Sequence, residues 1–217
     1  MQFFNIHTHH SLKSENVLSI QSFSLTNDSL VLPPDDAVSV GLHPWYANME
    51  RFDADFERLS EATQRPNVKM IGECGLDRLK GEPLPDQILM LEKQIVLAER
   101  VRKPLILHCV RAFPELMAVK DKMKVNVPMI IHGFNKHEEL GRQLLDKGFV
   151  LSFGAAILKA DSGASKLIQS TDNFFLETDD SDVTIEEIYE AAANLKKCYV
   201  GDLKARIFAD WKKLAYV

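Results

Sequence analysis

The sequence lacks the features that would support a disulfide framework, a membrane span or secretion. It contains three cysteines, an odd count without paired spacing, which argues against disulfides and suits a reducing cytoplasm. No apolar run approaches the roughly 20 residues that a membrane-spanning helix needs. The first residues also lack the basic and then apolar pattern of a secretory signal. We therefore expect a cytoplasmic protein without a membrane partner.

An excess of positive charge is also missing. Asp and Glu number 31 against 26 Lys and Arg, so the formal net charge is −5 at pH 7. A general nucleic-acid binder would be basic, so any contact with nucleic acid would depend on a local basic patch. The 217 residues contain no repeat and no long linker. We expect one domain over residues 1–217, as a monomer or a homodimer.

Short, β-rich apolar runs recur along the whole chain. Several are almost continuously hydrophobic, which is typical of strands buried on both faces. Helical patterns separate the later runs; in residues 86–100, for example, Ile88, Leu91 and Ile95 share one helix face. Eight strands alternating with helices favour an α/β fold, a TIM-type (β/α)8 barrel. The predicted strands are 3–9, 17–25, 37–43, 68–74, 105–110, 129–134, 149–153 and 174–178.

Two connections in this pattern are too short and too polar to form covering helices. They are residues 11–16 and 26–36, after the first and second predicted strands. We therefore expect a barrel that lacks its first two outer helices. The exposed flank would be covered by the C-terminal segment 202–214, by an apposed subunit or by ordered loops.

Two pairs of residues predict where later helices begin. Asn135 is followed three residues later by Glu138, and Thr184 is followed in the same way by Glu187. A side chain that caps the first turn, with an acid three residues further on, is typical of a helix N-terminus.

Polar residues gather at the ends of the predicted strands. In a parallel barrel the loops after the strands converge at one end, where catalytic groups assemble. A buried histidine or acid is costly unless it is paired or binds a metal. His7 and His9 would point to the same face of their strand, because side chains alternate. The strand-end residues are His7, His9, His43, Glu73, His108, His132 and Asp179.

The chemistry of these side chains indicates a metal site. Imidazole and carboxylate ligands without a thiolate suit Zn²⁺, Mn²⁺ or Mg²⁺ in an open site that retains water. Cys74 and Cys109 each follow a strand-end residue by one position, so they should point away from the site. We interpret both as packed thiols.

The order of these residues resembles that of the TatD family of metal-dependent hydrolases, which belongs to the amidohydrolase-like barrels. The shared order is His-x-His, Glu, two separate His and a final Asp. The resemblance runs from residue 3 to about residue 210, and its motifs together are specific. The segments that resemble the family's sequence blocks are 41–44, 72–77, 103–109 and 177–179.

The resemblance implies a deoxyribonuclease-type enzyme with two divalent metal ions. The two first histidines with Asp179 would hold one ion, the two later histidines the other, and Glu73 would bridge them. We assign Asp179 and Glu73 as catalytic residues, with Asp179 accepting the proton of the attacking water. Glu177 and Asp77 would support the site. The implied metal ligands are His7, His9, Glu73, His108, His132 and Asp179.

The chain departs from the family pattern on loops that would face the substrate. Asn5 replaces an Asp that often begins the first motif, and Arg111 lies one position after the usual arginine, which is Val110 here. Residues 133–136 read Gly-Phe-Asn-Lys, and Asp180 replaces the usual proline. No departure removes a metal ligand. Substrate specificity is therefore less defined by the sequence than metal binding.

We interpret His43, Arg111 and Lys136 as substrate-binding residues. His43 has the alternative of capping the turn that follows it. Trp45 and Tyr46 either stack on a nucleobase or cover the end of the barrel. Further cations after strand ends would add local positive charge around a phosphate, or would simply be solvated. They are Arg78, Lys80 and Lys159.

Three functions are consistent with this sequence. The first is a hydrolase that uses a metal-activated water to cleave phosphodiester bonds, with DNA as substrate. The second is the same chemistry on a carboxylic ester, amide or lactone, which the acidic net charge and the displaced arginine favour. The third is a catalytically inactive metal-binding barrel that serves as an interaction module. The intact ligand set argues against the third.

Overall fold

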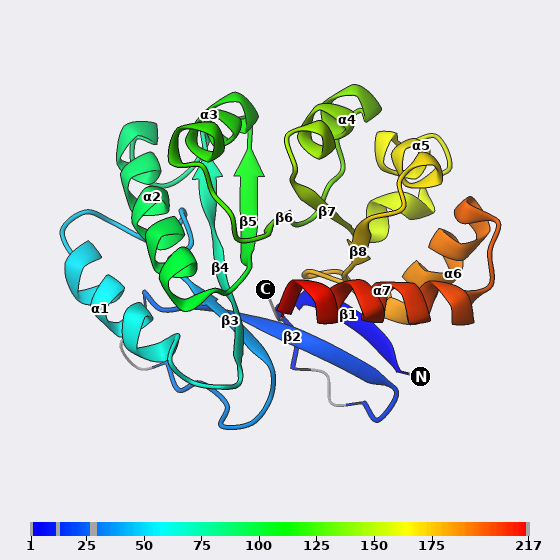
Figure 1. Cartoon of the computed structure of the whole chain (residues 1–217), viewed down its shortest axis with the longest axis horizontal. Coiled ribbons are helices and arrows are strands. Elements are labelled where there is room, and N and C mark those ends of the chain that lie inside the picture. The colour runs from blue at the N-terminus through cyan, green and yellow to red at the C-terminus, as the bar shows by residue number, and fades with distance from the viewer. Residues whose placement is uncertain (1, 12–13, 27–29, 216–217) are drawn as a thin grey trace. The chain divides into compact units, whose positions relative to one another are not determined.

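Eight strands and seven α-helices follow one another in the described part of the chain. The computed structural model describes residues 2–11, 14–26 and 30–215 (Figure 1). The strands are β1 (Phe3–Thr8), β2 (Val17–Ser24), β3 (Val38–Gly41), β4 (Val68–Asp77), β5 (Leu105–Val110), β6 (Met129–Ile131), β7 (Val150–Phe153) and β8 (Phe174–Leu176). Each predicted strand is therefore present, although β3, β6 and β8 are shorter than predicted.

The helices occupy the later connections. They are α1 (Phe52–Ala62), α2 (Leu84–Val101), α3 (Phe113–Met123), α4 (Glu138–Asp146), α5 (Gly163–Ser170), α6 (Ile185–Lys196) and α7 (Val200–Ala215), with a short 3-10 helix at Ala155–Leu158. Among the described residues, the connections after β1 and β2 contain no helix, as predicted; residues 12–13 and 27–29 of these connections lie outside the described residues. None of the helices described is both long and apolar enough to cross a membrane.

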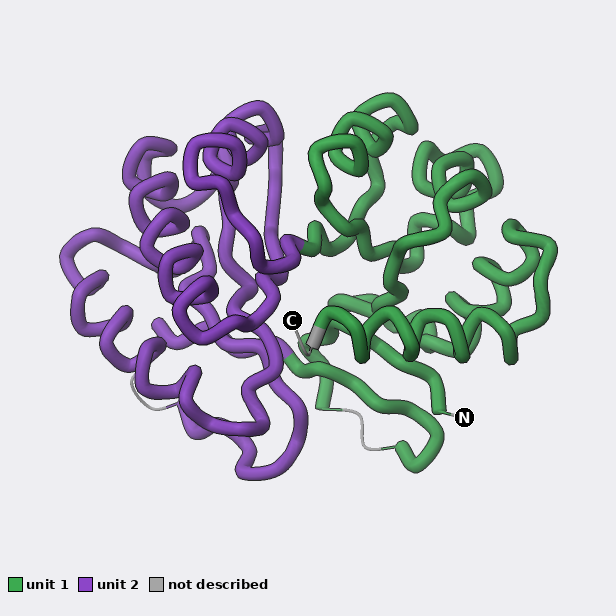
Figure 2. The backbone as a smooth tube through the Cα atoms, in the orientation of Figure 1, with its two compact units in different colours: residues 1–21, 130–216 green, residues 22–129, 217 purple. Residues whose placement is uncertain are grey.

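The chain divides into two compact units, shown in different colours in Figure 2. Among the described residues, unit 1 comprises 2–11, 14–21 and 130–215, and unit 2 comprises 22–26 and 30–129. The prediction of a single domain is not tested by this division and stays a prediction.

In unit 1, parallel pairing joins β1 to β2, β6 to β7 and β7 to β8. A parallel bridge between Thr8 and Asp179 links the end of β1 to the segment after β8. Helix α7 packs against β1 (Figure 1), where the ring of Trp211 stacks on that of Phe4 with centroids 5.1 Å apart. The C-terminal segment therefore covers β1, which was the first of the three arrangements predicted for the flank without helices.

In unit 2, β3, β4 and β5 pair in parallel, and α2 packs against β4. β4 approaches β5 closely at Gly75. This glycine has φ +145°, and a Cβ atom there would lie 1.9 Å from the carbonyl oxygen of His108. Only glycine fits this position. The close approach sets the register of the two strands whose side chains form the site described below.

The two predicted helix starts had different outcomes. Thr184 and Glu187 form a reciprocal capping box at the start of α6, as predicted. The prediction for Asn135 is wrong, because α4 begins at Glu138 and its cap is His137, whose Nδ1 accepts a hydrogen bond from Leu140 N at 3.3 Å. His137 has the extended backbone that a cap residue needs, and its ring nitrogen replaces the more common oxygen acceptor.

Candidate metal centre

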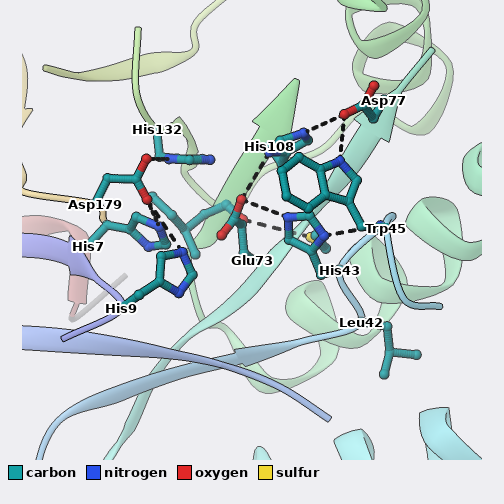
Figure 3. A network of polar contacts seen from close by, with 12 residues as sticks. His7, His9, Leu42, His43, Trp45, Glu73, Asp77, His108, His132 and Asp179 are labelled. Atoms are coloured by element: carbon teal, nitrogen blue, oxygen red, sulfur yellow. Dashed lines mark hydrogen bonds and ion pairs between the residues drawn. The ribbon is translucent and has the colours of Figure 1, made fainter. Parts of the chain in front are cut away.

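Five ionisable side chains of unit 1 form the β1–β8 cluster: His7, His9, His132, Glu177 and Asp179. Asp179 Oδ1 lies 3.4 Å from Nε2 of both His7 and His9. Its Oδ2 lies 3.9 Å from His132 Nδ1, which is 3.5 Å from Glu177 Oε1. Figure 3 shows the three histidines and Asp179 pointing toward one another. These ligand atoms form two groups, each within 4.8 Å, that could hold a metal ion.

The backbone of unit 1 fixes Asp179 against β1. Asp179 N donates to His7 O at 3.1 Å, and His9 N donates to Asp179 O at 3.0 Å. Asp179 has φ +53°, a left-handed conformation that few residues other than glycine adopt. Asn5 Nδ2 donates to Thr178 Oγ1 at 2.8 Å, and Thr178 N donates to Asn5 Oδ1 at 3.2 Å. The asparagine that departs from the family pattern therefore supports the neighbour of Asp179 instead of ligating.

The surroundings of Asp179 favour its ionised form. Burial by itself raises the pKa of this carboxyl, but hydrogen bonds from His7 and His9 and the charge of His132 hold the pKa well below its usual range. Glu177 is fully buried, and its Oε1 accepts a hydrogen bond from Gly133 N at 2.6 Å. Asp179 is about one-third exposed, so it is the acid of this cluster that a substrate can reach.

Four side chains of unit 2 form the β4–β5 cluster: His43, Glu73, Asp77 and His108. Glu73 Oε1 lies 3.0 Å from His43 Nε2 and 3.0 Å from His108 Nδ1 (Figure 3). All four side chains are buried. His43, Glu73 and His108 form a further group of ligand atoms within 4.8 Å that could hold a metal ion.

Asp77 fixes the orientation of His108. Its Oδ2 lies 3.1 Å from His108 Nε2 and accepts a hydrogen bond from the indole nitrogen of Trp45 at 2.6 Å. Its Oδ1 accepts from Leu79 N at 2.8 Å. Burial by itself would raise the pKa of Asp77, but the hydrogen bonds have the larger combined effect. The pKa of this carboxyl therefore lies below its ordinary value. A carboxylate on one imidazole nitrogen leaves the other nitrogen directed toward Glu73, as in many metal sites.

Two buried glutamines of α2 hold the backbone at or beside two members of this cluster, Asp77 and His43. Gln87 Oε1 accepts a hydrogen bond from Asp77 N at 2.7 Å, and its Nε2 donates to Asp77 O at 2.9 Å. Gln94 bonds both backbone groups of Leu42, which precedes His43, at 2.8 and 3.2 Å. We did not predict these residues from the sequence. The pattern that could have revealed them is a pair of glutamines, seven positions apart, on the apolar face of a predicted helix.

Each predicted metal ligand lies in one of the two clusters. The β1–β8 cluster contains four of them (His7, His9, His132 and Asp179), and the β4–β5 cluster contains Glu73 and His108. Of the predicted substrate-binding residues, His43 contacts Glu73 directly and so is also a possible ligand, which the sequence did not predict. Arg111 and Lys136 belong to neither cluster. Arg111 is exposed and has φ +51°.

The residues present fit a divalent metal ion. Both clusters contain only imidazole and carboxylate donors, the ligands of Zn²⁺ and Mn²⁺. Within the described residues, the buried Oε2 atom of Glu177 accepts no hydrogen bond. A buried carboxylate oxygen without a donor is costly, and a cation nearby would remove that cost.

The repeated strand–helix order, with imidazole and carboxylate side chains at the strand ends, defines the class of metal-dependent α/β barrels. The crystal structure of the TatD homologue YjjV from Escherichia coli has the same fold. It matches with a TM-score of 0.81 and 19% identity, over 99% of this chain and 98% of that one. The TIM-type (β/α)8 barrel predicted from the sequence is therefore confirmed.

Within that class, the model of the family described as TatD related DNase matches residues 25–208. The chain belongs to this family. A metal-dependent hydrolase of uncharacterised function from Haemophilus influenzae is 23% identical over 75% of this chain and 65% of its own length. The 3'-5' ssDNA/RNA exonuclease TatD of Cronobacter turicensis is 30% identical over 65% of this chain and 56% of its own length. The chain thus matches less than two-thirds of the length of these curated relatives.

Proposed function

We propose that this protein is a divalent-metal-dependent hydrolase that cleaves phosphodiester bonds in nucleic acid, with DNA as the first expected substrate. The observation that carries the proposal is that each of the two clusters contains at least one group of three imidazole and carboxylate side chains whose ligand atoms lie within 4.8 Å of one another. Family membership supports the reaction class, and the nuclease name of one relative supports the substrate. Location in the cytoplasm stays a prediction.

The proposed cofactors are two divalent ions, Zn²⁺, Mn²⁺ or Mg²⁺. The β1–β8 cluster would contribute His7, His9, His132 and Asp179, and the β4–β5 cluster would contribute Glu73 and His108. That Glu73 serves both ions remains a prediction from the family resemblance. When bound, such ions lower the pKa of water and stabilise the entering and leaving oxygens of phosphodiester hydrolysis.

The chain's own residues have distinct parts in the proposed reaction. Asp179 is the reachable carboxylate, so it accepts the proton of the attacking water at Oδ1 or Oδ2. Glu177 is buried and holds Gly133 N, so it stabilises the loop after β6 instead of reacting. Asp77 holds the imidazole of His108 in one orientation through Nε2.

The test is a hydrolysis assay on the full chain, stripped with a chelator and then supplied with Zn²⁺, Mn²⁺ or Mg²⁺ separately. The substrates are single-stranded DNA, single-stranded RNA, duplex DNA, bis-p-nitrophenyl phosphate and p-nitrophenyl acetate. We expect cleavage of nucleic acid and of the phosphodiester with metal and none after chelation. Turnover of the carboxylic ester alone would favour the second hydrolase hypothesis. No turnover of any substrate with any metal would contradict the proposed function.

A further inference from the structure

Exposed apolar side chains concentrate on two loops of unit 2. Nine large apolar or aromatic side chains are more than one-third exposed in the described part of the chain, and four of them lie on the loops after β3 and β4. These are Trp45, Tyr46, Met49 and Leu79. The loop after β3 also carries His43, and the loop after β4 begins directly after Asp77, so both loops adjoin the β4–β5 cluster. An exposed apolar patch beside polar ligands is a common feature of binding sites.

The two loops are packed against each other and form one surface. Gly81 has φ +87°, and a Cβ atom there would lie 2.0 Å from Pro44 O. The ammonium of Lys80 lies 3.6 Å from the centroid of the Trp45 ring. The hydrogen bond from Trp45 to Asp77 also joins the loops. Their relative placement is thus set by contacts and does not depend on a bound molecule.

Trp45 and Tyr46 differ in what their rings are free to contact. The Trp45 ring is held by Asp77, is covered on one face by Lys80 and is 36% exposed. The Tyr46 ring lies beside that of His43, with centroids 5.4 Å apart, and is 56% exposed. Trp45 therefore anchors the loop, whereas Tyr46 presents a ring to solvent next to the cluster.

A positive charge without an acidic partner lies on the same surface. Lys80 forms no ion pair with any residue that the structure describes, and its ammonium lies over the Trp45 ring. A cation next to exposed apolar rings matches a nucleotide, which has an apolar base and a charged phosphate. Met49 and Leu79 add apolar area, but neither supplies a flat ring for stacking.

We propose that Tyr46 and Lys80 form a nucleotide subsite that stacks an unpaired base on the Tyr46 ring and holds an adjacent phosphate with the Lys80 ammonium. The occupant is a single-stranded nucleic acid, because a paired base already stacks within its duplex and offers no free face. The inference rests on the proposed function, since the subsite would bind the nucleic acid that is the proposed substrate next to the β4–β5 cluster. It selects Tyr46, and not Trp45, as the stacking residue.

The test measures binding of labelled oligothymidylate to the full chain with metal chelated, so that it does not depend on turnover. Tyr46→Ala should weaken binding by about 5- to 150-fold, the effect of losing one stacked base. Tyr46→Phe should retain wild-type affinity, because the ring remains. Tyr199→Ala is the matched control, since Tyr199 is 83% exposed outside this surface. An abasic oligonucleotide of equal length should bind the wild type and Tyr46→Ala equally.

Lys80 has a separate readout in the salt dependence of the same affinity. Lys80→Gln should reduce the slope of log affinity against log salt by about 0.7, the value for one phosphate contact on a single strand. Tyr46→Ala should leave the slope unchanged, as should the control Lys93→Gln on α2. Equal affinity of Tyr46→Ala and wild type for oligothymidylate would overturn the subsite. Binding that depends on Tyr46 in a protein without nuclease activity would overturn the proposed function alone.

Discussion

Asp77 Oδ2 lies between two ring nitrogens, at 2.6 Å from the indole nitrogen of Trp45 and 3.1 Å from His108 Nε2. One buried carboxylate thus fixes both the loop after β3 and a candidate metal ligand on β5. The arrangement separates the roles of two neighbouring acids. Glu73 faces Nε2 of His43 and Nδ1 of His108, which could bind a metal, whereas Asp77 holds the His108 ring through its other nitrogen, Nε2.

We expect Asp77→Asn to weaken metal binding by about 10- to 100-fold, because a neutral amide replaces the charged carboxylate that accepts from His108 and orients its ring. Trp45→Phe is the control, since it removes the indole donor and leaves the contact between Asp77 and His108. The measurement is calorimetric titration of the metal-free protein with Zn²⁺ or Mn²⁺. If Asp77→Asn binds metal as tightly as wild type, Asp77 serves only the loop.

Asp179→Asn should lower turnover by about 10²- to 10⁴-fold at equal metal content, because the amide cannot accept the proton of the attacking water. Asp180→Asn changes the exposed neighbouring acid and should leave turnover unchanged. Initial rates on single-stranded DNA, with metal content checked by elemental analysis, decide the matter. Unchanged turnover in Asp179→Asn would show that another group is the base.

Metal binding should also stabilise the folded chain, because only the folded state brings the ligands of each cluster together. With metal at about 100 times its dissociation constant, the expected gain is about 2.7 kcal/mol. For a chain of this length that raises the melting temperature by about 5–10 °C. Thermal unfolding with and without chelator measures the shift, and His7→Ala should reduce it. The absence of a shift with Zn²⁺, Mn²⁺ and Mg²⁺ alike would count against a metal centre.

Tyr189→Phe should lower the free energy of unfolding by about 1–3 kcal/mol. The buried hydroxyl of Tyr189 donates to Phe4 O at 3.0 Å and accepts from Phe4 N at 3.3 Å, so its loss leaves two backbone groups of β1 without this partner. Tyr199→Phe, at an exposed position, should have no effect. Urea unfolding compares the variants, and equal midpoints would show that β1 satisfies these groups in another way.

Glu99 on α2 should give a stabilisation that depends on pH. Burial raises its pKa, but hydrogen bonds from Val127 N, Asn126 N and the Asn126 side chain outweigh this, so the pKa is lowered below its ordinary value. A lowered pKa means that the stabilisation is present above the ordinary pKa and is lost as pH falls through the pKa of the folded state.

We therefore expect Glu99→Gln to cost about 1 kcal/mol at pH 7, with the difference from wild type shrinking as the pH falls below about 4.5. Urea unfolding across this pH range measures that difference, and Glu57→Gln, at an exposed position, is the control. A difference that stays constant down to acid pH would show that the charge of Glu99 is not involved.

Much of the fold could be predicted because its determinants are local. Runs of β-branched and apolar residues located all eight strands, and the pairing of Thr184 with Glu187 located the start of α6. The error at Asn135 has the same cause, since a residue with good capping chemistry lies close to a less usual cap, His137. Local pattern does not reveal which of two neighbouring side chains accepts the first backbone hydrogen bond.

The sequence by itself determined the alternation of strands and helices and the types of side chain at each strand end, because both depend on residue type and spacing along the chain. Tertiary structure decided which of these side chains meet. The contact of His43 with Glu73, 30 positions later, and the bond from Trp45 to Asp77, 32 positions later, depend on how the loops pack. Such contacts are set by the register of neighbouring strands and by buried residues such as Gln87 and Gln94, whose hydrogen bonds exist only once the helix and the loops are packed together.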